Sequence, residues 1–315
     1  MPLRQPGLPW HHAGAETLSY VSVKDKHQNW NVESLWQTLL PLLPGISIEV
    51  LARAESTNSA LLERVKSEAR NGERQAYGRR AHDMQPCLLV AEHQTHGRGR
   101  LGRAWLSAPE SSLTFSLALN LAPADWSGLS LAVGCAIAEA LEPTDKTGPA
   151  PRLTLKWPND IWLDGRKLGG ILIETVAAGE GRMAVIGVGL NIKELSAGND
   201  GEDSTAQFNT GFAALNELLP DCTAPAALAL IAPALVQCLL DFEQNGFAAW
   251  HQRYARRDLT LGHSVSAGEV QGISQGVNAQ GELLLQTPQG RVAISGGEVS
   301  VRLAAPATTP IRQEG

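Results

Sequence analysis

Residues 97–105 read Gly97-Arg98-Gly99-Arg100-Leu101-Gly102-Arg103-Ala104-Trp105, just downstream of the apolar run Cys87–Ala91. That run has the length and composition of a buried strand, which anchors the loop at a sheet edge. The glycines let backbone N–H groups approach a ligand closely, and the arginines add fixed positive charge with paired donors. The stretch therefore predicts a phosphate-binding loop at the end of a strand. A flexible basic loop or an RNA contact is the alternative that composition alone leaves open.

Strand and helix signals continue on both sides of this loop. Upstream, a strand at 46–51 leads into Ser56-Thr57-Asn58, residue types that cap helices, and apolar residues follow at helical spacing. Downstream, strands are expected at 113–121, 153–157, 161–163, 168–174 and 183–192, and helices at 128–141, 226–245 and 247–256. Pro233 is expected to kink or break its helix. From residue 259 on, short runs with glycine turns predict a small β-barrel or sandwich.

The overall composition excludes several classes of protein. A chain of 315 residues has room for about two domains. Its net charge of -6 argues against a dedicated nucleic-acid binder. Four widely spaced cysteines without a CxxC pair predict reduced thiols. No signal peptide is visible, and the most apolar stretches, 129–141 and 226–240, are too short to span a membrane. The sequence thus predicts a cytoplasmic protein with no membrane and no nucleic-acid partner.

A second charged motif, Lys156-Trp157-Pro158-Asn159-Asp160, ends a predicted strand. A lysine there is costly to bury without an anionic partner. Beside a developing negative charge it would act as an electrophilic stabiliser. The alternative is an ordinary Asn-Asp turn with Lys156 in solvent.

Glycines also interrupt two strand-like runs, at Gly169-Gly170 within 167–174 and at Gly187 and Gly189 before Asn191. Glycine inside a strand marks either close approach by a ligand or another backbone, or a β-bulge. The motifs GxxxxGK[ST], HExxH and GxSxG are absent. The pair His93 and His96 has no third ligand at suitable spacing, so no metal-binding side chains are expected. The candidate functional residues are therefore the arginines, lysines and glycines of these motifs.

Taken in order, these segments resemble the biotin protein ligase family. The resemblance is carried by Ser56-Thr57-Asn58, by Glu92-His93-Gln94 with the loop 97–105, and by the motifs at 156–160, 167–172, 187–192 and 296–300. Each motif is weak alone, but their order and spacing match across about 46–303.

The resemblance implies an α+β fold. A catalytic domain (46–258) with a mixed β-sheet flanked by helices, of the class II aminoacyl-tRNA synthetase type, would precede a small SH3-like C-terminal β-barrel (259–303). Residues 1–45 are expected to be a poorly defined lead-in and residues 304–315 a tail. Some members of the family carry a longer N-terminal DNA-binding domain. The short lead-in here, without a basic recognition helix, indicates the ligase-only type.

The same resemblance implies the reaction and its residues. Biotin would be activated with ATP and Mg²⁺ to biotinyl-5′-AMP and transferred to a lysine of a biotin carboxyl carrier protein, an acetyl-CoA carboxylase subunit. The catalytic residues implied are Arg98, Arg100 and Lys156. The biotin contacts implied are Ser56, Thr57, Asn58, Gln94, Arg98, Gly99, Arg100, Lys156, Gly169 and Gly170. The contacts to ATP and the adenylate implied are Arg100, Arg103, Trp105, Asn159 and Asn191.

Several alternatives stay open beside this hypothesis. A lipoate or octanoate ligase would share the adenylation chemistry, although the glycine-arginine loop and the glycine-rich C-terminal region favour biotin. A biotin-responsive transcription factor is opposed by the acidic balance and by the missing helix-turn-helix. A non-enzymatic RNA-binding module built on the glycine-arginine loop is a third alternative. Whether the chain forms a homodimer is open. So is the backbone shape at Ser107–Leu113, where the family usually has a glycine-asparagine pair.

Overall fold

The computed structural model describes residues 28–72, 85–144, 148–178, 181–194, 211–295 and 301–303. Its main body is built on seven strands: β1 (Ser47–Ala54), β2 (Cys87–Gln94), β5 (Ser112–Asn120), β6 (Leu153–Lys156), β7 (Asp160–Leu163), β8 (Arg166–Ala178) and β9 (Gly181–Asn191). They form one sheet in the order β1-β2-β5-β9-β8-β7-β6. Only β1 and β2 pair in parallel, and the other neighbours are antiparallel. The sheet is therefore mixed, as expected.

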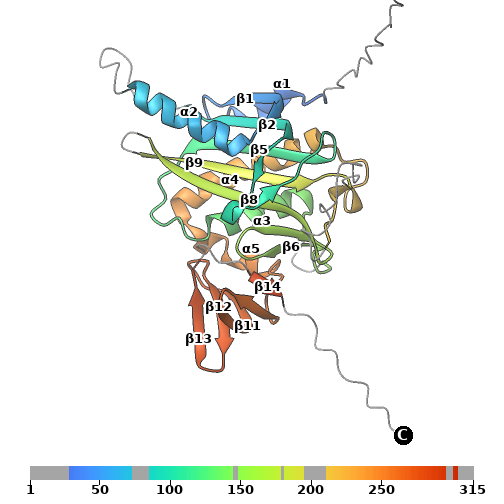
Figure 1. The fold of residues 1–315 in the computed structure, drawn as a ribbon, viewed down its shortest axis with the longest axis vertical. Coiled ribbons are helices and arrows are strands. Elements are labelled where there is room, and N and C mark those ends of the chain that lie inside the picture. The colour runs from blue at the N-terminus through green and yellow to red at the C-terminus, as the bar shows by residue number, and fades with distance from the viewer. Residues whose placement is uncertain are drawn as a thin grey trace, which may run out of the picture.

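Helices cover both faces of this sheet (Figure 1). On one face, α2 (Thr57–Gly72) packs Leu61 and Val65 against Leu89 and Val185. The other face carries α1 (Val32–Leu39), α3 (Leu129–Leu141) and α4 (Ala224–Asn245), followed by the short α5 (His251–Ala255) and the 3₁₀ turns η2 (Leu215–Glu217) and η3 (Phe247–Ala249). The predicted strands and helices of the main body are confirmed within a few residues at their ends.

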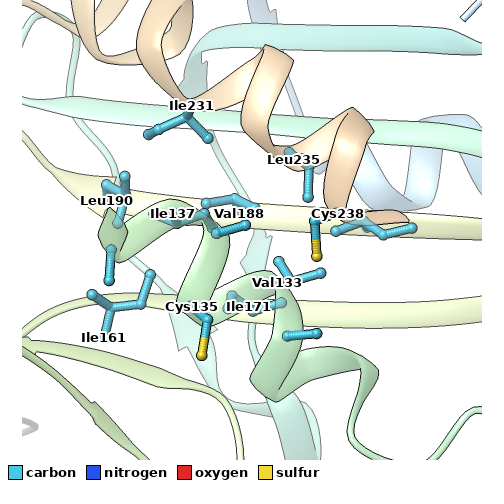
Figure 2. Packing of buried hydrophobic residues seen from close by; sticks show 14 of the residues in the cluster. Val133, Cys135, Ile137, Ile161, Ile171, Val188, Leu190, Ile231, Leu235 and Cys238 are labelled. Atoms are coloured by element: carbon cyan, nitrogen blue, oxygen red, sulfur yellow. The ribbon is translucent and has the colours of Figure 1, made fainter. Parts of the chain in front are cut away.

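The main core lies between α3, α4 and the sheet. Figure 2 shows Ile137 of α3, Ile231 of α4 and Leu190 of β9 among the side chains that meet there. In the described part of the chain, α4 is the one helix long and apolar enough to cross a membrane, yet half of its most apolar window is buried by the rest of the protein. Figure 2 places it as a core helix. The two apolar stretches are thus buried helices, as predicted.

The expected break at Pro233 is wrong, because α4 runs from Ala224 to Asn245 through that proline. Buried residues precede and follow Pro233 along this helix, among them Ile231 and Leu235. Tertiary packing of this kind supplies most of a helix's stability and outweighs one missing hydrogen bond. The helix begins where Thr223 accepts a hydrogen bond from Ala226 N and ends at Gly246.

A second, smaller sheet follows the main body. It contains β10 (Ser264–Ala267), β11 (Val270–Val277), β12 (Leu283–Thr287), β13 (Gly290–Ile294) and β14 (Val301–Leu303), all antiparallel in the order β13-β12-β11-β10-β14. This arrangement is consistent with the SH3-like barrel that was expected. Trp157 joins the two units, since its Nε1 donates to Gly281 O at 3.0 Å. The lead-in up to residue 27, the loop 195–210, the motif at 296–300 and the tail from 304 lie outside the described residues.

Candidate active site

The buried N-terminus of α2 forms the floor of a cavity, and the end of β2 holds it in place. Ser56, Thr57 and Asn58 are all buried. Thr57 donates its backbone N–H to Gln94 Oε1 at 2.7 Å, and its hydroxyl donates to the same oxygen at 3.2 Å. First-turn N–H groups of a helix lack intrahelical partners, so Gln94 acts here as a cap supplied by a neighbouring strand.

Asn58 is fixed by the sheet beneath it. Its Nδ2 donates to Leu172 O at 3.1 Å and to Glu174 Oε2 at 3.0 Å, both on β8. Ser116 of β5 donates to Asn58 Oδ1 at 2.6 Å. A Cβ on Gly187 would lie 2.1 Å from Asn58 Oδ1, so a glycine is needed there to leave room for the amide. The side chain is consequently held in one orientation.

The glycine-arginine stretch forms a small hairpin beside this floor. Its strands β3 (Gly97–Arg98) and β4 (Ala104–Trp105) pair with each other, and η1 (Arg100–Gly102) makes the turn. Gly102 has φ +70°, a conformation that glycine adopts without strain. The predicted loop is thus an ordered turn in this structure.

Two arginines tie the hairpin to the body. Arg98 donates to both carboxylate oxygens of Glu174 on β8. Arg100 Nη1 donates to Asn159 Oδ1 at 3.3 Å, and Asn159 itself donates to Ile171 O at 2.8 Å. The hairpin is therefore tied to β8 directly through Arg98 on its first strand and, by way of Asn159, through Arg100 in its turn.

Trp105 closes one wall of the cavity. Its indole ring lies on Gly189, where an added Cβ would come 2.4 Å from Trp105 Cε2. Trp105 Nε1 is buried and has no hydrogen-bond partner within the described residues. Gly189 is thus required by a neighbouring side chain, which is neither the approach of a ligand or backbone nor the β-bulge that the sequence left open.

One cavity, partly open to solvent, collects most of the expected residues. The expected residues in its lining are Ser56, Thr57, Asn58, Gln94, Arg98, Trp105, Asn159 and Gly170. The lining also contains residues that sequence reasoning did not assign to the site: Phe115, Asp160, Lys167, Ile171, Leu172, Gly187, Val188 and Gly189. The cavity combines a floor of hydroxyl and amide groups with a cationic edge.

The lysine in this cavity is Lys167, and the expected position of Lys156 in it is wrong. Lys167 Nζ lies 2.7 Å from Asp160 Oδ1, and both side chains line the cavity. Lys156 Nζ instead lies 4.9 Å from the centre of the Trp162 ring, outside this lining. A register shift between β7 and β8 puts Lys167 opposite Trp162, and strand spacing alone cannot predict such a bulge. The sequence signal was the lysine directly before Leu168-Gly169-Gly170.

Five other expected residues lie around the cavity but outside its lining: Gly99, Arg100, Arg103, Gly169 and Asn191. Asn191 is buried and donates to Ala213 O at 3.1 Å, so it fixes the segment that begins at residue 211. A Cβ on Gly169 would lie 2.5 Å from Gly189 O, so close strand contact and the nearby bulge together explain this glycine.

The segment that departs from the usual family pattern is held by hydroxyl groups. Ser107 Oγ accepts from Gln94 N at 2.8 Å, and Ser112 Oγ accepts from Ala108 N at 3.2 Å. Glu110 has φ +61°, a left-handed conformation that glycine and asparagine adopt more readily. The segment therefore turns at a non-glycine residue in a left-handed conformation, which carries some strain.

Positive and negative side chains alternate at the rim of the cavity. Arg98 faces Glu174, and Lys167 faces Asp160. Burial lowers the pKa of Arg100, while the charge of Asp160 opposes that shift. A guanidinium remains charged at physiological pH regardless. An anion entering here therefore meets cations that are already held in place.

Comparison with known sequences identifies the class of protein. The profile of the Biotin/lipoate A/B protein ligase family matches residues 53–191, and the profile of the Biotin protein ligase C terminal domain matches residues 264–302. The bifunctional ligase/repressor BirA of Escherichia coli K12 is 35% identical over 273 residues, covering 84% of this chain and 77% of that protein. The biotin–[acetyl-CoA-carboxylase] ligase of Mycobacterium tuberculosis is 32% identical over 262 residues, covering 80% of this chain and 88% of that protein. The chain belongs to the biotin protein ligase family.

A solved structure supports the same assignment. The biotin protein ligase from Aquifex aeolicus in complex with biotin and ATP superposes with a TM-score of 0.62 at 26% identity, covering 82% of this chain and 99% of that one. The fold class and the family expected from the sequence are thus confirmed.

Proposed function

We propose that this chain activates biotin with ATP to biotinyl-5′-AMP and then transfers the biotin to a lysine of a biotin carboxyl carrier protein. The proposal rests most on one observation, that a single cavity joins the Ser56-Thr57-Asn58 floor to Lys167 and Arg98 at its edge. Membership of the biotin protein ligase family supports the substrate. The urea group of biotin has N–H donors and a carbonyl acceptor. The hydroxyl and amide groups of the cavity floor can accept from the donors and donate to the carbonyl.

The first step joins two anions. An oxygen of the biotin carboxylate attacks the α-phosphorus of ATP. A bond forms between that oxygen and the phosphorus, the bond to the bridging oxygen breaks, and pyrophosphate leaves. The two reacting groups repel each other and are well solvated in water, so the enzyme must supply positive charge and hold them in line. We assign the carboxylate to Lys167 and Arg98, which line the cavity, and the nucleotide to Arg100 with its partner Asn159. We assign to Lys167 the role that sequence reasoning gave to Lys156.

The second step consumes the adenylate. The ε-amine of the acceptor lysine attacks the acyl carbon, the amide forms, AMP leaves and the amine loses a proton. The adenylate hydrolyses if water reaches it, so the hairpin 97–105 must stay closed until the acceptor arrives. Arg103 and Trp105 belong to this hairpin and would cover the nucleotide. Asn191 would act indirectly by fixing the segment at Ala213.

ATP enters such reactions as its magnesium complex. Mg²⁺ prefers carboxylate and phosphate oxygens and keeps several waters, so it needs few protein ligands. Asp160 is the carboxylate in the cavity lining and is already paired with Lys167. The residues present fit a metal that arrives on the triphosphate and neutralises part of its charge.

We propose that the catalytic domain spans 46–258 and the C-terminal domain 259–303, because the first strand of each sheet begins at Ser47 and Ser264. We also propose a cytoplasmic location, since the described cysteines are unpaired thiols. The expected partners are biotin, ATP and the carrier protein. We propose no membrane or nucleic-acid partner and leave the monomer or homodimer state to measurement.

Pyrophosphate release by the purified chain, measured with biotin and with lipoate or octanoate in parallel, tests this proposal. We expect ATP-dependent release with biotin and little with the other two acids. Preference for lipoate or octanoate would make the chain a lipoate-type ligase. Salt-sensitive RNA binding without turnover would favour the nucleic-acid alternative.

A further inference from the structure

Glu174 is an acidic residue beside a site built to hold anions. It lies on β8, and its side chain is 29% exposed. The motifs that predict the site give it no role. Its carboxylate nevertheless contacts both the glycine-arginine hairpin and the cavity floor.

On the hairpin side, Glu174 holds Arg98. Arg98 Nη2 donates to Oε1 and Oε2 of Glu174, and the arginine side chain is 43% exposed. Arg98 also lines the cavity. A half-exposed arginine can adopt many rotamers, and an anionic partner on a rigid strand limits this freedom.

On the floor side, Asn58 holds Glu174. Asn58 Nδ2 donates to Glu174 Oε2 at 3.0 Å, and its orientation is fixed by Ser116 and by the space at Gly187. A continuous set of hydrogen bonds therefore runs from the buried start of α2 through Glu174 to the half-exposed side chain of Arg98. The floor thus sets the position of the carboxylate, and the carboxylate sets the position of the guanidinium.

We propose that Glu174 is a positioning residue that acts through Arg98, keeping the hairpin 97–105 closed over the activated acid. This inference rests on the proposed function. Loss of the carboxylate leaves Arg98 chemically intact but free to leave the cavity. Biotin then meets a less organised cation, and the adenylate escapes through a hairpin that has lost one of its ties to β8. The groups that react are the same once the substrates are bound, so the rate of the chemical step should change little.

The test compares Glu174→Ala, Arg98→Ala and the double variant in the full chain. We expect Glu174→Ala to raise the KM for biotin about tenfold, the usual weight of a hydrogen bond to a charged group. We expect kcat for carrier biotinylation to change by less than about threefold. Steady-state pyrophosphate release without acceptor protein should rise, because escaping adenylate frees the site for another turnover. The double variant should be no worse than Arg98→Ala alone, because the effect passes through that arginine.

Glu139 offers a matched control. It pairs with Arg253 on the far side of the sheet, and the two side chains are 30% and 40% exposed, much like the pair at the site. Glu139→Ala should therefore lower the melting temperature about as much as Glu174→Ala while leaving the KM and the acceptor-free release unchanged. Equal kinetic effects from both variants would overturn the proposal, because the loss would then reflect general destabilisation.

Hydrogen exchange of the ligand-free enzyme gives a reading that is independent of turnover. We expect amides of 97–105 to exchange faster in Glu174→Ala and Glu174→Gln than in the unaltered chain or in Glu139→Ala. Unchanged exchange together with an unchanged KM for biotin overturns the inference. A double variant with a higher KM than Arg98→Ala alone overturns it as well. If the unaltered chain does not use biotin at all, the proposed function fails, and the exchange result still decides whether Glu174 holds the hairpin.

Discussion

Lys167 Nζ lies 2.7 Å from Asp160 Oδ1, and the pair lines the same cavity as Arg98 and the start of α2. The carboxylate of Asp160 compensates the charge of the partly buried Lys167 ammonium at the cavity edge. An entering carboxylate can then share this cation.

Replacing this lysine should disable adenylate formation. We expect Lys167→Ala to slow single-turnover pyrophosphate release about 10²–10³-fold, the usual cost of removing one preorganised electrostatic contact. Lys156→Ala should change the rate by less than about threefold, because Lys156 contacts the Trp162 ring outside the cavity. The reverse ranking of the two variants would restore the assignment made from the sequence.

The space around Asn58 gives a second prediction. Gly187→Ala would place a Cβ 2.1 Å from Asn58 Oδ1, so the amide must rotate or shift. We expect the KM for biotin to rise about 10²-fold, since small displacements in a binding site carry costs of this size. Gly134→Ala on α3 is the control, because Gly134 lies outside this cavity and its Cβ would come no closer than 3.2 Å to a methyl group of Leu155. Binding measured by calorimetry should separate the two variants, and equal losses would rule out the contact as the cause.

Arg100 gives a prediction about selectivity. Arg100→Gly removes the hydrogen bond to Asn159 and a cation that we propose contacts the nucleotide. We expect the adenylate to escape more readily and to react with lysines on bystander proteins. Mass spectrometry of an unrelated protein included in the reaction measures this loss of selectivity. Unchanged biotin affinity together with unchanged acceptor selectivity would refute the covering role of the hairpin.

Asp258 gives a prediction about pH. Burial raises its pKa above the ordinary value, although hydrogen bonds from Thr260 oppose the shift. The folded state therefore holds its proton more tightly than the unfolded state, so this group favours folding at low pH and costs stability as the pH rises through the raised pKa. Asp258→Asn removes that cost. We expect the variant to melt a few degrees higher at neutral pH. The difference should shrink toward the acidic range below the ordinary pKa of the carboxyl, and a constant difference across pH would contradict this account.

Much of the fold could be predicted because local signals and burial agree. Residues 87–91 and 183–190 are apolar runs that lie in strands of the main sheet. Leu129–Leu141 is apolar on nearly all sides and lies between the sheet and another helix. A break at Pro233 does not occur, since the local cost of the proline is outweighed by packing against residues far away in sequence.

The sequence could predict which residues lie near one another at the site, but not which side chains face the cavity. Order and spacing of the motifs brought Ser56, Gln94, Arg98 and Asn159 to one cavity. That Lys167 faces the same cavity as Gly170 depends on a one-residue bulge beside Leu168, and a period of two cannot reveal it. Glu174 was missed for a related reason, because its role comes from side chains 76 and 116 residues away.

The most direct test of the central claim is mass spectrometry of a purified biotin carboxyl carrier domain after incubation with this chain, ATP, Mg²⁺ and biotin. The account predicts the mass gain of one biotin on a single lysine, dependent on ATP and lost with Lys167→Ala. A carrier domain that stays unmodified, or one modified equally well by Lys167→Ala, would contradict it.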